Sequence, residues 1–143
     1  MNRKTPPPIG YFISDYEKEI RKICVCLEND GMQYKLLSDF VIQYSSDELV
    51  IEIAFERYGD VVTIDYIVGN SEFPLQGKCD QSSYSLAWTV SEIANSKDIE
   101  RLKGMSKLEK ISFYIGFFRA NREMLIDKKT ADRIKESYEQ IGI

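Results

Sequence analysis

The fold is decided by the stretch Glu48-Leu49-Val50-Ile51-Glu52-Ile53-Ala54-Phe55-Glu56-Arg57, Tyr58-Gly59-Asp60, Val61-Val62-Thr63-Ile64-Asp65-Tyr66-Ile67-Val68. In its first part, large apolar side chains alternate with glutamates, which is the period of a strand with one apolar face. Its last part is rich in β-branched residues, which favour strands. The short connection around Gly59 predicts a hairpin turn. We therefore expect two antiparallel strands, at residues 48–57 and 61–68.

Further strands are predicted on both sides of this hairpin. Residues 34–44 are also rich in β-branched and aromatic side chains, which predicts another strand, with a break near Ser38-Asp39. Ser45-Ser46-Asp47 is short enough for a second hairpin turn, so the strands should form an antiparallel meander. Residues 69–83 lack a clean period and predict a long connection that can hold a short strand around Phe73 to Leu75. The sheet should have three to four strands.

A helix is predicted upstream of the strands. Ser14 is followed three residues later by Glu17, the spacing of a capping box that satisfies free N–H groups at a helix start. Gly31 stands where a left-handed C-terminal cap is common. Because apolar residues follow a helical period between these signals, we expect a helix over residues 15–30.

Several helices are predicted downstream of the strands. A second capping box, from Ser106 to Glu109, opens the most apolar helix of the chain, which should run to about Ile126 and pack on the sheet as a core helix. The sequence thus predicts one α+β domain over residues 13–143, with helices on one sheet face and a flexible segment at residues 1–12. The other expected helices cover residues 84–94, 99–103 and 130–140.

Bulk properties place the chain among ordinary globular proteins. It has 143 residues, 43% of them hydrophobic, which suits a single core. Prolines follow the basic N-terminus where a signal peptide needs an apolar region, and no apolar run approaches the roughly 20 residues that span a bilayer. The spacing of Cys24, Cys26 and Cys79 fits no zinc or redox motif, so we expect free thiols and no metal site. These features predict a cytoplasmic protein that is not inserted in a membrane.

Catalysis and cofactor binding have little support in the sequence. The chain contains no histidine, the usual general base and metal ligand, so histidine-based triads and zinc sites are excluded. Phosphate-binding glycine motifs are also absent, and we expect no cofactor. A carboxylate pair drawn from Glu52, Glu56 and Asp65 can still perform acid and base chemistry, but alternation with apolar residues favours a solvated strand face. We therefore expect a protein that is not an enzyme.

Charge is distributed unevenly along the chain. Residues 38–80 carry nine acidic and two basic side chains, a balance of −7, whereas residues 101–143 carry ten basic and six acidic ones. Acidic groups mixed with small apolar ones on the outer sheet face suit a cationic protein partner, and they would repel the phosphates of a nucleic acid. The predicted contact residues are Glu52, Glu56, Tyr58, Thr63 and Asp65.

Residues 47–64 (Asp47-Glu48-Leu49-Val50-Ile51-Glu52-Ile53-Ala54-Phe55-Glu56-Arg57-Tyr58-Gly59-Asp60-Val61-Val62-Thr63-Ile64) and Leu108-Glu109-Lys110-Ile111-Ser112-Phe113-Tyr114 carry a family resemblance. These segments belong to an order of elements, namely a helix, a β-meander, a long connection, a strongly apolar helix and a polar terminal helix. In this order the chain resembles small bacterial immunity proteins that neutralise polymorphic or contact-delivered toxins. The resemblance implies stoichiometric binding of a cognate toxin, with the acidic sheet face against a basic cleft.

Two alternatives stay open. One is a chaperone of the type III secretion class, which resembles this chain in size, acidity and composition and which dimerisation through a helix would favour. The other is a small-ligand regulatory domain, which a deep preformed pocket would favour. The sequence leaves the oligomeric state undetermined.

Overall fold

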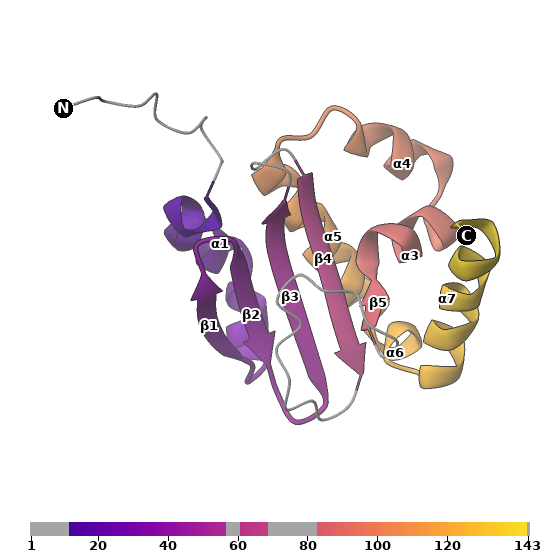
Figure 1. Ribbon diagram of the computed structural model, residues 1–143, viewed down its shortest axis with the longest axis horizontal. Helices are drawn as coiled ribbons and strands as arrows, with labels where there is room; N and C mark the ends of the chain where they lie inside the picture. The colour runs from indigo at the N-terminus through magenta and orange to yellow at the C-terminus, as the bar shows by residue number, and fades with distance from the viewer. Residues whose placement is uncertain (1–11, 57–60, 69–82, 143) are drawn as a thin grey trace.

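A five-stranded antiparallel sheet forms the centre of the molecule (Figure 1). The structure is a computed structural model in which residues 12–56, 61–68 and 83–142 are described. Strands that follow one another in the chain are neighbours in space, in the order β1-β2-β3-β4-β5, so the predicted meander and the α+β class are confirmed. The strands are β1 (Gln33–Ser38), β2 (Val41–Ser45), β3 (Leu49–Glu56), β4 (Val61–Val68) and β5 (Ser83–Ser85).

The sheet has more strands than expected, because two short pairings were not foreseen. Residues 34–44 form the tight hairpin β1–β2, in which the Ser38 hydroxyl accepts a hydrogen bond from the Phe40 N–H at 3.1 Å and the register shifts after Leu36. At the other edge, Tyr84 pairs with Tyr66 in β4 as part of β5, so the helix predicted to begin there starts two residues later. The short strand considered around residues 73–75 lies outside the described residues.

Helices cover one face of the sheet (Figure 1). The helices α3 and α5 both contact β4, and α1 packs beside α5. The predicted segment 1–12 lies outside the described residues except for Phe12, and none of the helices that the structure describes is long and apolar enough to cross a membrane. The helical elements are η1 (Ile13–Tyr16), α1 (Glu17–Ile23), α2 (Val25–Asn29), α3 (Leu86–Ile93), α4 (Ser96–Leu102), α5 (Lys107–Ala120), α6 (Arg122–Leu125) and α7 (Lys128–Gly142).

The core lies between the sheet and these helices. Alternation along β3 and β4 turns Ile53, Tyr66 and their neighbours toward α5, where they join Phe118 in one buried cluster. The rings of Tyr66 and Phe118 are 5.2 Å apart in an edge-to-face arrangement. The Tyr66 hydroxyl donates a hydrogen bond to the Leu125 carbonyl at 3.3 Å, so the core is also fixed by a polar contact.

The two predicted capping boxes differ in outcome. At α5 the prediction is confirmed, since the Ser106 hydroxyl accepts from the Glu109 N–H and the Glu109 carboxylate accepts from the Ser106 N–H. At the first helix it is wrong. The Ser14 hydroxyl donates to the Asp39 carboxylate at 3.0 Å, and the Glu17 carboxylate accepts a hydrogen bond from Tyr34. Tertiary partners have replaced the local ones.

Two long helices of the prediction are interrupted. The helix expected over residues 15–30 is divided into η1, α1 and α2, with a break at Cys24, and it does end at Gly31 with a φ of 96°, as expected for a left-handed cap. The core helix expected to reach Ile126 ends at Ala120. At the break, the Asn121 side-chain amide donates to the Phe117 carbonyl at 2.9 Å and so competes with the helical hydrogen bonds.

Candidate functional site

The pairing of β3 with β4 brings most of the predicted contact residues onto one face of the sheet. Glu52 lies directly opposite Asp65, Thr63 opposite Ala54, and Glu56 opposite Val61. Because neighbours along a strand point to opposite faces, Glu52, Glu56, Thr63 and Asp65 lie on the face away from the helices. Tyr58, the fifth predicted residue, lies outside the described part of the chain.

The central carboxyls of this face are buried. Glu52 is 2% exposed and Asp65 is 8% exposed, and the adjacent Val50 and Ile67 form a second, smaller apolar cluster. Glu56, at the end of β3, is exposed, and Thr63 is partly buried. This differs from the expected solvated face, since only the Glu56 end of the acidic group is open to solvent.

A row of polar side chains crosses the whole sheet through Glu52. The Gln43 amide, on β2, donates a hydrogen bond to the Glu52 carboxylate at 3.1 Å. Cross-strand pairing extends the row at both ends, because each member lies directly opposite the next one. From β1 to β5 the row consists of Lys35, Gln43, Glu52, Asp65 and Ser85.

Asp65 is the electrostatically strained member of this row. Burial, followed by the nearby negative charges of Glu56 and Glu52, raises the pKa of its carboxyl from 3.8 to about 6. No hydrogen bond from any described group reaches the Asp65 carboxylate. Carboxyls whose pKa is displaced by burial and by a like charge occur often at functional sites, which makes this face the first candidate.

The chemistry available to the acidic face is limited by its composition. Two adjacent carboxyls, one of them with a raised pKa, can exchange a proton or bind a cationic group. Within residues 12–56, 61–68 and 83–142, no group of three or more histidine, cysteine, aspartate or glutamate side chains is placed to hold a metal ion. A pair of carboxylates can also accept hydrogen bonds from an organic cation, such as a lysine or arginine side chain.

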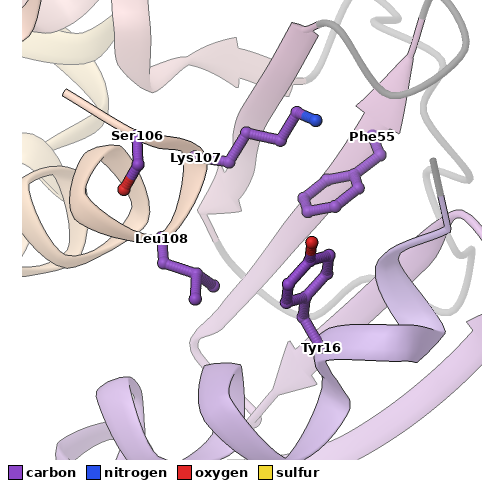
Figure 2. Close-up of a pocket in the computed structure, with 5 residues that line it drawn as sticks. All are labelled: Tyr16, Phe55, Ser106, Lys107 and Leu108. Carbon is purple, nitrogen blue, oxygen red and sulfur yellow. The ribbon is translucent and has the colours of Figure 1, made fainter. Parts of the chain in front are cut away.

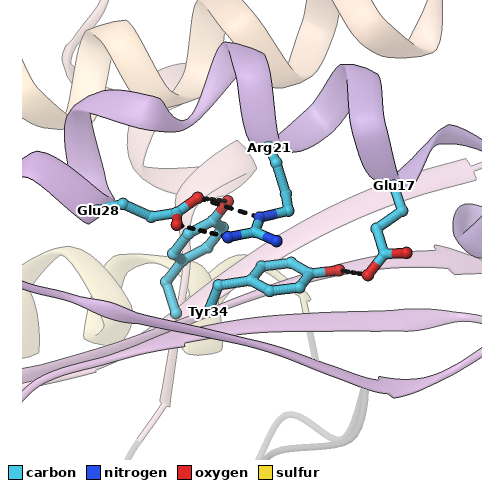
Figure 3. Close-up of polar contacts among 5 residues, drawn as sticks. Glu17, Arg21, Glu28 and Tyr34 are labelled. Carbon is cyan, nitrogen blue, oxygen red and sulfur yellow. Dashed lines mark hydrogen bonds and ion pairs between the residues drawn. The ribbon is translucent and has the colours of Figure 1, made fainter.

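A second charged cluster joins the first helices to the strands (Figure 3). Arg21 and Glu28 form a two-pronged ion pair, with N–O distances of 2.7 and 3.3 Å, and the Arg21 guanidinium lies 4.3 Å from the centre of the Tyr34 ring. Tyr34 donates to Glu17, and Tyr44 donates to Glu28 at 3.5 Å. The hydrogen bonds from Arg21 hold the pKa of the Glu28 carboxyl below its usual range. Because these groups satisfy one another, the cluster fastens α1 and α2 to the hairpin β1–β2.

A small cavity lies between η1, the end of β3 and the start of α5 (Figure 2). Its volume is about 240 Å³, and the rings of Tyr16 and Phe55 are 6.0 Å apart along its wall. The Lys107 ammonium lies 5.4 Å from the centre of the Phe55 ring. Ser106 and Leu108 complete the lining.

Neither the charged cluster around Arg21 nor the cavity beside Phe55 was predicted from the sequence. Each joins segments that are distant in the chain, and only the capping box at Ser106 marked one side of the cavity in advance. The sequence pattern around Tyr16, Phe55 and Leu108 predicts that they are core residues. It gives no sign that a space remains between them.

Comparison with known proteins gives no relative: no family model, no curated protein and no solved structure matches the chain. Its function has to be inferred from the acidic face, the cavity and the distribution of charge.

Proposed function

We propose that this chain is a non-catalytic protein-binding domain that recognises a cationic protein through the acidic face of β3 and β4. The observation that carries the proposal is the burial of Asp65 beside Glu52 and Glu56, which raises its pKa to about 6. Holding like charges together away from water is unfavourable, and a positively charged side chain brought by a partner reverses the sign of that interaction.

Glu56 is the accessible end of this acidic group. It ends β3 in an exposed position, and the buried carboxyls of Glu52 and Asp65 lie behind it on the same face. Buried charges are screened less by salt than exposed ones, so the Asp65 carboxylate adds to the negative potential that a partner meets at Glu56. Contact through Glu56 and Thr63, supported by this potential, explains how a face with buried acids can still attract a cation.

The partner class follows from the resemblance of residues 47–64 and 108–114 to bacterial immunity proteins. We propose a cognate toxin with a basic active-site cleft as the partner, bound in the bacterial cytoplasm in a stoichiometric complex. The acidic face supports this proposal because it would oppose such a cleft with charge of the opposite sign.

Reversal of one exposed charge tests the proposal. A basic protein encoded beside this one would be purified with it, and its affinity for wild type and for Glu56→Arg measured by calorimetry at several salt concentrations. We expect about a tenfold loss of affinity at low salt, and a shallower salt dependence, because like charges then meet at the interface. Glu52 is unsuitable for this test, since a reversed charge in its buried position would unfold the sheet.

Glu19→Arg provides the matched control. Glu19 is an exposed glutamate of α1, on the side of the sheet that carries the helices. Its reversal changes the net charge by the same amount and should leave the affinity nearly unchanged. Equal affinities of wild type and Glu56→Arg would refute binding through the acidic face.

The two alternative functions, a secretion chaperone and a small-ligand domain, can be distinguished by the mass of the particle in solution and by the size of the ligand that the protein binds. A stable dimer by light scattering would favour the secretion chaperone. The cavity beside Phe55, at about 240 Å³, is below the roughly 300 to 1,000 Å³ of typical small-molecule sites, so a ligand of that size seated elsewhere on the protein would favour the small-ligand alternative.

A further inference from the structure

The cavity at the end of β3 has walls of two kinds (Figure 2). Tyr16, Phe55 and Leu108 supply apolar surface, and the Lys107 side chain runs alongside it toward the Phe55 ring. The Ser106 hydroxyl is engaged at the start of α5, where it accepts the hydrogen bond from the Glu109 N–H. The cavity is therefore a mostly apolar hollow whose wall also carries the Tyr16 hydroxyl, directed toward Phe55, with the Lys107 ammonium at its rim.

The cavity has the size of a site for one side chain. Its volume of about 240 Å³ is too small for most drug-sized molecules, whereas interfaces commonly place single aromatic anchors in such hollows. Phe40 is 39% exposed, and its carbonyl accepts the Phe55 N–H at 3.0 Å. An exposed aromatic ring therefore stands on the turn between β1 and β2, where it packs against Phe12 with ring centres 5.4 Å apart.

The lining selects the kind of side chain. A lysine or arginine would lose its water against Phe55 and Leu108, and so would a carboxylate. An aromatic ring does not meet this cost. It can pack edge-to-face against Tyr16 or Phe55, whose rings already form a tilted pair at 52°, and its face attracts the Lys107 ammonium.

We infer that this cavity is the anchor site for an aromatic side chain of the partner protein, an inference that rests on the proposed protein-binding function. Phe55 and Glu56 are successive residues, so they point to opposite faces at the same end of β3. A partner that grips this end places a ring in the cavity on one side and a cationic group at Glu56 on the other. Aromatic anchor and electrostatic contact then belong to one interface.

The aromatic preference can be measured without the partner. The probe is p-cresol, which carries the ring of a tyrosine side chain, and its saturated analogue 4-methylcyclohexanol is the comparison. Nuclear magnetic resonance of the Leu108 methyl groups during titration should show p-cresol binding with a dissociation constant on the order of 1 mM, as expected for so small a ligand. The saturated analogue should bind several times more weakly.

Two variants tie the binding to the cavity. Lys107→Met removes the cation and keeps the length of the side chain, so it should weaken p-cresol about two- to fivefold without affecting the saturated analogue. Leu108→Phe fills the space and should abolish both. Lys110→Met, one turn further along α5 and outside the lining, is the control for loss of a lysine. A well-dispersed amide spectrum verifies that each variant is folded.

The results of these binding experiments test the anchor site separately from the acidic face, which the Glu56→Arg variant tests. Equal binding of ring and saturated analogue, or p-cresol binding that persists in Leu108→Phe, would overturn the anchor site. In the complex with the partner, Leu108→Phe should lower affinity without changing the salt dependence, whereas Glu56→Arg changes both. If Glu56→Arg has no effect while Leu108→Phe weakens the complex, the acidic face fails and the anchor site stands.

Discussion

In the folded chain, the Asp65 carboxyl is buried beside two glutamates, and its pKa is about 6 instead of 3.8. Between these two values the folded state binds more protons than the unfolded state. The free energy of unfolding therefore falls as pH rises from about 4 to about 6, and the cost persists at neutral pH. This is the reverse of the usual contribution of a carboxylate that is held by a cationic neighbour.

Asp65→Asn should therefore stabilise the protein at pH 7. A shift of about two pKa units corresponds to roughly 3 kcal/mol, so we expect a gain of about 1 to 3 kcal/mol, which disappears near pH 4, where Asp65 is largely protonated. Urea unfolding of wild type and variant at pH 7, 5.5 and 4 measures the difference. Asp47→Asn, an exposed position in the turn before β3, should change stability by less than about 0.5 kcal/mol. A variant that is less stable than wild type at pH 7 would contradict this account of Asp65.

Tyr34 and Tyr16 allow a matched comparison of hydroxyl groups. The Tyr34 hydroxyl donates to the Glu17 carboxylate, whereas the Tyr16 hydroxyl has no hydrogen bond with a described residue. Tyr34→Phe should lower the free energy of unfolding by about 1 kcal/mol, and Tyr16→Phe should leave it nearly unchanged. Thermal unfolding of both variants tests this, and equal melting temperatures would show that the contact between Tyr34 and Glu17 contributes nothing.

At the scale of elements, the start of α5 depends on its reciprocal cap. Ser106→Ala removes the hydroxyl that accepts the Glu109 N–H, and we expect a loss of about 1 kcal/mol in unfolding experiments. Ser112→Ala, at an exposed position in the middle of α5, should be neutral or slightly stabilising, because alanine has the higher helix propensity. If both serine variants had the same stability, the cap would be energetically unimportant.

Elements whose signals are local were predictable from the sequence. The alternation in β3 and β4 follows from the period of a strand, and the capping box of α5 needs only residues within one turn. The box at Ser14 failed although its residues fit, because the Ser14 N–H, which the Glu17 carboxylate would accept, donates to the carbonyl of Asp39, 25 positions away, and the Ser14 hydroxyl is turned to the Asp39 carboxylate. The strand β5 was missed since three residues carry too little pattern, and its pairing with β4 decides its conformation.

At the scale of the whole molecule, the site was predictable in part. Side chains of a strand alternate between its two faces, so the sequence positions of Glu52, Glu56, Thr63 and Asp65 required them to lie on one face, as they do. Their burial was not predictable, because it depends on how the rest of the chain packs and not on alternation. The cavity beside Phe55 was unpredictable for the same reason, since it is a gap left by three segments that meet only in the folded protein.

The order of the strands has a consequence for how the chain folds. Each strand pairs with the next one in sequence, and residues 39–40, 46–48 and 57–60 are the only chain between the first four strands. Closing such short loops costs little entropy, and a low contact order goes with fast folding. The hairpins can form one after another from local encounters, whereas joining β5 across residues 69–82 closes the longest loop within the sheet. Four strands can therefore be in place before the fifth, and the edge at β4 is the last to be completed.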